Sequence, residues 1–251
     1  MIDLSDTSVL ITGGSRGIGA ACTRFFARAG AQVAVHYHRN EQAALEVLHE
    51  LTEVPTGEHM VIGADLRDPE QIDAVASQLG EHWKGLDCLV NNAAIWERNA
   101  LDSLGPVQLE QTWQLNVRAP FLMSHAILEL MDGRSDPSIV NISSTAGQRG
   151  EALHSPYAAS KGAMIATTKS WAAELAPAIR VNSVAPGWVD TDMSAPAFEG
   201  GGRTAIEATI PLARIATAED IAGAVLFLAS QLARDITGEI LNVNGGSVLC
   251  G

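Results

Sequence analysis

The chain has 251 residues, of which 47% are hydrophobic and 18% are charged, and its formal net charge is -13 at pH 7. This composition is typical of a well-packed enzyme core, and no Pro-, Ser- or Gly-rich linker divides the chain, so we expect a single domain over residues 1–251. The acidic charge repels a phosphate backbone and no basic patch interrupts it. We therefore expect no nucleic-acid partner.

The sequence also argues against a membrane protein and against a metal or disulfide framework. No run approaches the roughly 20 apolar residues of a membrane-spanning helix, and the acidic start (1–6) is unlike a signal peptide. Cys22, Cys88 and Cys250 lie far apart, without a CxxC pair or paired histidines. We expect no membrane partner, no metal site and a reducing, cytoplasmic setting.

Short apolar strands and helices alternate along the chain. Strands are expected at VLIT (9–12), QVAVHY (32–37), HMVIGAD (59–65), CLVNNA (88–93), SIVNISS (138–144), RVNSVAP (180–186) and EILNVN (239–244). Helices are expected at 20–29, from 41, around 109–131, at 157–176 and at 218–230. This alternation predicts an α/β fold of three layers, doubly wound and Rossmann-like, with a parallel sheet of about seven strands.

The glycine-rich segment TGGSRGIG (12–19) directly follows the first expected strand and opens a helix. Glycines there let the backbone turn sharply and approach a pyrophosphate, whose charge meets the N–H groups at the helix N-terminus. The spacing is G-x-x-x-G-x-G, so a tight strand-to-helix turn without a ligand is the alternative. The expected cofactor contacts here are Gly13, Ser15, Arg16, Gly17, Ile18 and Gly19.

The end of the second expected strand indicates which dinucleotide is used. An acid at this place binds the ribose 2′-OH of NAD, whereas basic residues accept the 2′-phosphate of NADP. Here the strand ends in HYHRN (36–40), with no acid before Glu41. Arg39, beside His38 and together with Arg16, can pair with a 2′-phosphate through charge-assisted hydrogen bonds. We expect NADP(H), with NAD(H) as the alternative if Arg39 is only a solvated residue at a helix entry.

A tyrosine and a lysine lie four residues apart in YAASKGA (157–163), which reads as the start of a helix. That spacing places Tyr157 and Lys161 on one helix face. A phenol is a poor proton donor or acceptor at neutral pH, and a neighbouring ammonium is expected to lower its pKa. Ser144, at the end of an expected strand, can hydrogen-bond a substrate oxygen and hold it against the phenol. The Y-x-x-x-K spacing by itself is also compatible with an ordinary tyrosine–lysine pair on a helix surface.

These motifs together resemble those of the short-chain dehydrogenase/reductase family, and the resemblance covers nearly the whole chain. Besides TGGSRGIG, it rests on AD (64–65), NNAA (91–94), LNVRAPF (115–121), ISS ahead of YAASK, PGWVDTDM (186–193) and ITGEILNVNGG (236–246). The resemblance implies a Rossmann-like sheet, NAD(P)(H) and a homotetramer, in which the helices around 109–131 and 157–176 pair between subunits. The family spacing selects Ser144 rather than Ser143 as the serine that faces the cleft.

The resemblance also assigns roles to individual residues. Asp65 and Leu66 are expected at the adenine, and Asn92 and Ala93 along the adenosine side. The loop after the sixth strand is expected to hold the nicotinamide, with cofactor contacts at Pro186, Gly187, Val189 and Thr191. Asn116 is expected to open its helix and hold a water that links Lys161 to solvent, completing a proton relay to Tyr157. A turn-forming role for Asn91 and a plain helical role for Asn116 are the alternatives.

The motifs indicate the reaction but not the substrate, so residues outside the motifs must determine which substrate binds. Trp96 and Trp188 are expected to border the substrate cleft as apolar walls, and His154 and Glu151 to add polar contacts or to lie exposed in loops. The glycine-rich stretch 194–211 is typical of a flexible lid that closes over bound substrate. These features favour a small secondary alcohol or its ketone.

Two other functions are compatible with parts of the sequence. The motifs are most similar to those of 3-oxoacyl-(acyl-carrier-protein) reductases, whose acidic carrier requires basic residues beside the cleft. Here Ala173 stands where those reductases tend to carry Arg, the turn 131–136 is acidic on balance, and the net charge is -13. A free small-molecule substrate is therefore preferred, with the acyl-carrier reductase as the alternative. A nucleotide-sensing protein without catalysis is disfavoured because Tyr157 and Lys161 are both present.

Overall fold

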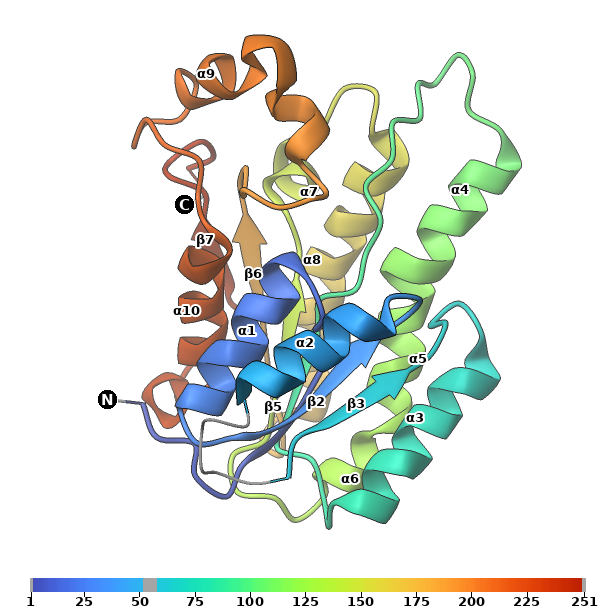
Figure 1. Ribbon diagram of the computed structural model, residues 1–251, viewed down its shortest axis with the longest axis vertical. Coiled ribbons are helices and arrows are strands. Elements are labelled where there is room, and N and C mark those ends of the chain that lie inside the picture. Colours follow the sequence, from blue (N-terminus) through green and yellow to red (C-terminus); the bar gives the residue numbers. More distant parts are fainter. Residues whose placement is uncertain (1, 52–57, 250–251) are drawn as a thin grey trace.

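Parallel strands form one sheet in the described part of the chain, which is residues 2–51 and 58–249 of a computed structural model (Figure 1). The strands are β1 (Ser8–Ile11), β2 (Gln32–Tyr37), β3 (Met60–Gly63), β4 (Cys88–Asn91), β5 (Ser138–Ile142), β6 (Arg180–Pro186) and β7 (Ile240–Val243). Their order is β3-β2-β1-β4-β5-β6-β7, and every neighbouring pair is parallel. The expected seven-stranded Rossmann-like sheet is confirmed, with its winding reversed between β1 and β4.

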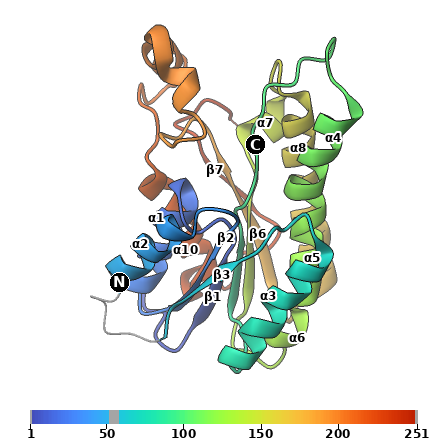
Figure 2. The ribbon, with the colours of Figure 1, turned by 45° about the vertical axis from the view of Figure 1, so that its right-hand side comes forward.

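Helices cover both faces of this sheet, as the edge-on view in Figure 2 shows. One face carries α1 (Gly17–Arg28), α2 (Glu41–Leu51) and α10 (Ala218–Ala229). The other carries α3 (Pro69–His82), α4 (Pro106–Trp113), α5 (Ala119–Ala126), α6 (Leu128–Met131) and α8 (Ser155–Leu175). The short α7 (Thr145–Arg149) and α9 (Gly202–Glu207) lie beyond the carboxyl ends of the strands.

The two cores follow from the alternation of side chains along each strand. In β1, Val9 and Ile11 pack with Phe26 of α1, whereas Leu10 packs with Leu89 and Ile127 on the opposite face. All six side chains are fully buried. Because both sheet faces are covered, the strands are mostly apolar on both sides, although β5 and β6 also bury polar residues such as Asn141, Asn182 and Ser183. Cys22 and Cys88 are buried thiols, and Cys250 lies outside the described residues.

The long helix expected around 109–131 is instead divided into α4, a π-helical turn (Gln114–Arg118), α5 and α6. Pro120 explains the first division, because proline has no N–H to donate to the carbonyl of Asn116, four residues earlier. The helix therefore opens at Asn116, as expected. Among the helices of residues 2–51 and 58–249, none combines the length and the apolar character that crossing a bilayer requires.

Candidate active site

Loops that follow β1 and β4 are joined by the side chain of Thr12. Its hydroxyl accepts hydrogen bonds from the backbone N–H groups of Asn92 (2.9 Å) and Ala93 (3.1 Å) and donates to the carbonyl of Val90 (3.1 Å). The Asn92 amide in turn donates to the Thr12 carbonyl at 2.8 Å. These hydrogen bonds join the glycine-rich segment to the NNAA segment beyond the carboxyl ends of β1 and β4, where the strand order changes direction.

The glycine-rich segment has the shape that a pyrophosphate requires. Gly13 and Gly17 adopt positive φ angles of 64° and 51°. A Cβ atom on Gly19 would lie 2.1 Å from the carbonyl oxygen of Gly13, so this approach is open only to glycine. The N-cap residue of α1, Arg16, makes no side-chain cap, and the first turn holds no acidic residue. The first backbone N–H groups of α1 therefore remain available to an anion, and the residues fit a dinucleotide.

The loop after β6 reaches the same glycine segment. A Cβ atom on Gly17 would lie 3.3 Å from Cγ2 of Thr191, and the guanidinium of Arg16 lies 3.7 Å from the carboxylate of Asp192. Val189 is buried two residues earlier, and its carbonyl accepts a hydrogen bond from Ser194. The structure thus brings Thr191 and Val189 next to the phosphate-binding loop, where a nicotinamide contact was expected.

At the adenine side, the carboxylate of Asp65 is bound by its own neighbours. The Arg67 side chain donates three hydrogen bonds to it, at 2.9, 3.2 and 2.7 Å, and the His38 imidazole lies 3.4 Å away. The Arg67 hydrogen bond is the main cause that lowers the pKa of Asp65 to about 2. Arg67 was missed in the sequence, although its place two residues after Asp65 was a usable signal. Leu66 is buried, and Arg39 is exposed without an ion-pair partner among the described residues.

A second residue that the sequence did not single out is His36 in β2. Its ring accepts a hydrogen bond from the backbone N–H of Gly13 at 3.0 Å, and its other nitrogen lies 3.1 Å from the carbonyl oxygen of Ala64. The side chain is 2% exposed. It therefore connects the glycine segment to the strand end that precedes Asp65.

Ser144 and Ser143 point in different directions, as the family spacing implied. The Ser143 hydroxyl lies within the sheet, where it donates to the carbonyl of Val184 at 3.0 Å and accepts from Ser183 at 2.9 Å. Ser144 is the N-cap of α7 and its oxygen accepts the N–H of Ala146 at 3.0 Å. Ser144 is also close enough to the Tyr157 hydroxyl to lower the pKa of that phenol, whereas Ser143 is not among the causes of its shift.

Tyr157 lies in the first turn of α8, with Lys161 one turn further on. The Lys161 ammonium lies 5.7 Å from the centre of the Tyr157 ring and donates to the carbonyl of Ile142 at 2.8 Å. Burial lowers the pKa of Lys161 to about 8, and burial raises the pKa of Tyr157 to about 12, against a smaller lowering by the Ser144 hydrogen bond. The expected lowering of the phenol pKa by Lys161 is therefore wrong for the protein's own groups, because withdrawal from water outweighs the distant ammonium.

Asn116, in the π-helical turn, hydrogen-bonds both the loop after β4 and helix α8. Its amide exchanges two hydrogen bonds of 2.9 Å with the backbone of Ile95 and donates to Ser160 at 3.1 Å. Ser160 donates to the carbonyl of Tyr157 at 2.7 Å. Asn116 thus fixes the segment before Trp96 against the helix turn that carries Tyr157, and its role in a relay to Lys161 stays a prediction.

Aromatic rings from separate loops form a continuous wall beside these residues. Trp96 stacks on His154, with ring centres 4.3 Å apart and planes 7° apart, and meets Trp188 edge-on at 5.9 Å. Trp188 contacts Phe198 at 5.9 Å. We call Trp96, His154, Trp188 and Phe198 the aromatic wall. Phe198 was missed in the sequence because its contact with Trp188 depends on the path of the intervening loop.

Two contacts connect the aromatic wall to charged groups. The indole N–H of Trp96 donates to the carboxylate of Glu151 at 3.3 Å, and the charge of Glu151 is close enough to raise the pKa of Tyr157. Arg203 forms an ion pair with Asp190 at 2.6 Å and lies 4.7 Å above the Phe198 ring. The wall is therefore adjacent to Tyr157 at one end and to stretch 194–211 at the other. That stretch contains a 3-10 helix (Ala195–Gly201) and α9 rather than an irregular loop.

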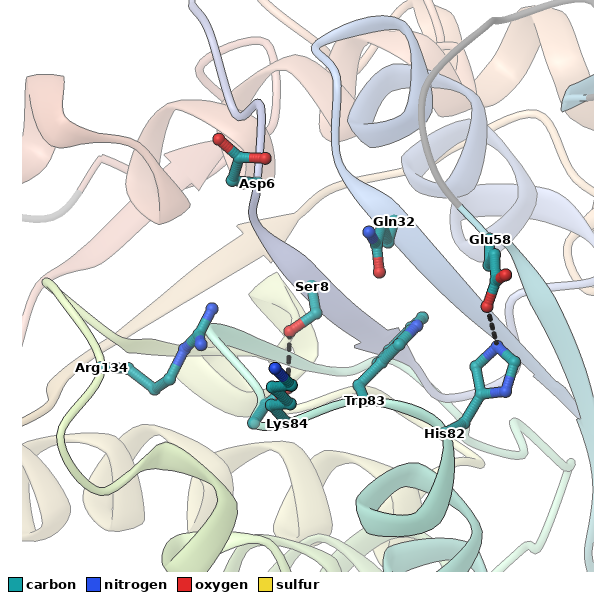
Figure 3. A pocket seen from close by; sticks show the side chains of 9 residues that line it. Asp6, Ser8, Gln32, Glu58, His82, Trp83, Lys84 and Arg134 are labelled. Atoms are coloured by element: carbon teal, nitrogen blue, oxygen red, sulfur yellow. Dashed lines mark hydrogen bonds and ion pairs between the residues drawn. The ribbon is translucent and has the colours of Figure 1, made fainter.

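A hollow of about 300 Å³ lies at the other end of the strands, where they begin (Figure 3). It is lined by Ser8 and Gln32, the first residues of β1 and β2, and by the segment around Trp83 and Lys84. It therefore adjoins the amino ends of the strands, away from Ser144 and Tyr157. Ligands of doubly wound sheets bind at the carboxyl ends, so this hollow is not the active site.

Known proteins are similar to this sequence over nearly its whole length. A family model described as Enoyl-(Acyl carrier protein) reductase matches residues 13–247. A 3-oxoacyl-(acyl-carrier-protein) reductase of Vibrio cholerae is 37% identical over 98% of this chain and 98% of its own. A 3alpha-hydroxysteroid dehydrogenase of Mediterraneibacter gnavus is 40% identical over 97% of this chain and 98% of its own. The chain belongs to the short-chain dehydrogenase/reductase family.

The solved structures agree with this membership. The structure of a blue fluorescent protein from a metagenomic library, in complex with NADPH, superposes with a TM-score of 0.92 and 35% sequence identity over 98% of this chain and 100% of that one. As a short-chain dehydrogenase/reductase, the protein is an oxidoreductase that acts on CH–OH groups or their carbonyls with NAD(P). The names of its relatives differ in substrate, so the family alone does not select one.

Proposed function

We propose that this short-chain dehydrogenase/reductase interconverts a free, largely apolar ketone and its secondary alcohol with NADP(H). The aromatic wall is the observation that carries the proposal. It places rings of Trp96, His154 and Trp188 beside the residues that handle the carbonyl oxygen. Such a surface favours a flat apolar substrate, because ring contacts add to the free energy of apolar burial.

The chain's own groups hold the carbonyl and supply its proton. Ser144 lies close enough to Tyr157 to lower the pKa of the phenol, so a substrate oxygen placed between the two receives a hydrogen bond from the serine and a proton from the phenol. Because the pKa of Tyr157 is about 12, the phenol holds its proton at neutral pH, as reduction requires. The bound nicotinamide supplies or accepts the hydride. Lys161, with a pKa of about 8, is mostly a cation at pH 7 and favours return of the proton from solvent.

NADP(H) is proposed over NAD(H) because of the charges around the adenosine site. Arg16 and Arg39 are exposed there, and no acidic residue ends β2. The carboxylate of Asp65 is paired with the guanidinium of Arg67, which offsets its repulsion of a 2′-phosphate. The structurally similar protein that binds NADPH supports the same choice.

The stretch 194–211 is proposed as the substrate lid. Its Phe198 completes the aromatic wall through Trp188, and its Arg203 pairs with Asp190 in the loop after β6. The lid thus touches the same loop that carries Thr191. Closing the lid over substrate would exclude water from the carbonyl that Tyr157 protonates.

A second candidate is the reduction of a 3-oxoacyl group on a carrier protein, which the Vibrio cholerae relative favours. The surface of α8 argues against it, since Ala173 and Glu174 occupy exposed positions there and the net charge is -13. An acidic carrier protein would meet like charge on this protein. Comparing acetoacetyl-carrier protein with its free thioester decides the matter, because a large preference for the carrier form would overturn the first proposal.

A homotetramer is proposed as the assembly. Helix α4 exposes Val107, Leu109 and Trp113, and Phe121 of α5 meets Trp171 of α8 edge-on at 4.9 Å. These helices therefore present apolar side chains to a partner. Light scattering after size-exclusion chromatography measures the assembly, and a monomer at micromolar concentration would contradict it.

The substrate proposal is tested with a panel of ketones and alcohols in the presence of NADPH or NADP+. We expect the highest kcat/KM for cyclic or aromatic ketones, and lower values for short polar ones. A preference for polyols or for small charged oxo acids would contradict the aromatic wall as the substrate-binding surface. Equal rates with NADH would contradict the cofactor assignment alone.

A further inference from the structure

His36 is a buried imidazole that the chemistry described above does not use. It lies in β2, paired in register with Ile62 of β3, and is 2% exposed. Its ring accepts the backbone N–H of Gly13 at Nδ1 (3.0 Å), and its Nε2 lies 3.1 Å from the carbonyl oxygen of Ala64. Both ring nitrogens thus have backbone partners, on segments 23 and 28 residues away in sequence.

The two partners determine the protonation state of the ring. A backbone N–H can only donate, so Nδ1 must carry a lone pair, and a carbonyl can only accept, so Nε2 must carry the hydrogen. This is the neutral Nε2–H tautomer. Burial, the largest cause, lowers the pKa of His36 to about 4; the charge of His38 lowers it further, whereas the Ala64 carbonyl and the charge of Asp65 oppose the shift. The ring therefore stays neutral at physiological pH.

The same residue also holds the next amide of the glycine segment. The backbone N–H of Gly14 donates to the carbonyl of His36 at 2.8 Å. Two successive amides, of Gly13 and Gly14, are thus bound by one residue, the first by its ring and the second by its backbone. Gly13 has a φ of 64°, a conformation that glycine adopts readily, so the two contacts with His36 hold a backbone that has other conformations open to it.

We propose that His36 is a positioning residue for the dinucleotide, which sets the separation between the phosphate-binding glycine segment and the adenine-side segment 64–66. Its neutral ring holds Gly13 on one side and Ala64 on the other. Ala64 directly precedes Asp65, and its own N–H donates to the carbonyl of Tyr37. The inference rests on dinucleotide binding at this loop.

An apolar side chain of similar volume would fill the same space but not perform this role. It would leave the Gly13 N–H and the Ala64 carbonyl without their partner, and buried polar groups that lose a partner destabilise the arrangement that held them. A purely space-filling role and a positioning role therefore predict different outcomes for polar and apolar replacements.

Three variants separate the two ring contacts. His36→Asn keeps an acceptor near the position of Nδ1 and loses the contact with Ala64. His36→Gln extends a polar group toward Ala64 and loses the acceptor at Gly13. His36→Leu fills the space and loses both. Each is compared with wild type by fluorescence titration with NADPH, by kcat at saturating NADPH, and by hydrogen exchange at the Gly13 and Gly14 amides of the free protein.

We expect His36→Leu to weaken NADPH binding about 10-fold or more and His36→Asn to stay within about 3-fold of wild type, with kcat little changed in both. The Gly13 and Gly14 amides should exchange faster in His36→Leu than in His36→Asn. Equal weakening in these two variants, or NADPH affinity in His36→Leu equal to that of wild type, would overturn the positioning role. If His36→Leu does not fold, the pair His36→Asn and His36→Gln decides, since wild-type NADPH affinity in both would also overturn the positioning role.

Failure of the proposed function is distinguishable in the same titrations. Wild type that binds neither NADPH nor NADH would refute dinucleotide binding and, with it, the role of His36. Wild type that binds NADPH while all three variants match it would refute the role of His36 alone.

Discussion

The Lys161 ammonium donates its hydrogen bond to the carbonyl of Ile142 and lies 5.7 Å from the centre of the Tyr157 ring. The lysine is thus anchored to the last residue of β5, which lies two residues before Ser144. Burial moves the two pKa values apart, to about 8 for the lysine and about 12 for the phenol. At neutral pH the pair therefore consists of a proton-bearing phenol and a cation, which suits protonation of a carbonyl oxygen.

Replacing Tyr157 with Phe removes the proton donor and leaves the ring in place. We expect kcat for ketone reduction to fall about 10²- to 10⁴-fold, the usual contribution of a positioned general acid. NADPH affinity, measured by fluorescence titration, should stay close to that of wild type. Near-normal turnover of any accepted substrate by Tyr157→Phe would show that another group supplies the proton.

The rate of ketone reduction should depend on pH through Lys161. Because the pKa of this lysine is lowered to about 8, its charge is present below that pH and is lost above it. We expect kcat/KM for reduction to decline as the pH rises through about 8, while Tyr157 remains protonated. Lys161→Arg keeps its charge over this range, so its profile should lack the decline even if its rate is lower. A wild-type profile that is flat to pH 9.5 would contradict this role.

The fold and the central site residues could be predicted because they are encoded locally. Continuous apolar strands, a glycine segment after β1 and the spacing of Tyr157 and Lys161 all appear within short windows. Even the opening of the helix at Asn116 has a local cause, Pro120. What could not be predicted depends on contacts between distant segments. His36 meets Gly13 and Ala64 across neighbouring strands, and Phe198 meets Trp188 across a loop.

The direction of the Tyr157 pKa shift was wrong for a related reason. Sequence spacing shows that Lys161 is near, but it does not show how far the ammonium is from the phenol or how little water reaches either group. Arg67 is different, because it lies two residues from Asp65 and binds it directly. The sequence ADLRD (64–68) contains both residues, so an ion pair between Asp65 and Arg67 could have been predicted from their spacing.

The cofactor assignment depends on Arg39. Replacing it with Ala removes an exposed guanidinium near the expected 2′-phosphate, so we expect NADPH affinity to fall about 10-fold and NADH affinity to change little. Arg28→Ala, which removes an exposed guanidinium from the far end of α1, is the matched control and should leave both affinities unchanged. A preference ratio in Arg39→Ala equal to that of wild type would assign the 2′-phosphate to other residues.

The aromatic wall predicts how substrate selectivity changes at Trp96. Trp96→Ala loses the stacking contact with His154 and the edge contact with Trp188, so KM for a cyclic ketone should rise about 10-fold, with a smaller effect on a short aliphatic ketone. Trp96→Phe keeps a ring but loses the N–H bonded to Glu151, and should retain most of the selectivity. Equal losses on both ketones would indicate that Trp96 supports the fold of the cleft without contacting substrate.

His36 also predicts how the stability of the protein depends on pH. Its pKa is about 4 in the folded state against an ordinary value of 6.5, so the unfolded chain takes up a proton first as the pH falls. The stabilisation is complete above pH 6.5 and is lost progressively toward pH 4, by about 2 kcal/mol between pH 6.5 and 5. Asn does not titrate, so the free energy of unfolding of His36→Asn, measured in urea, should decline less over this range than that of wild type. Because both proteins share every other titrating group, parallel declines would mean that His36 is not a buried neutral base.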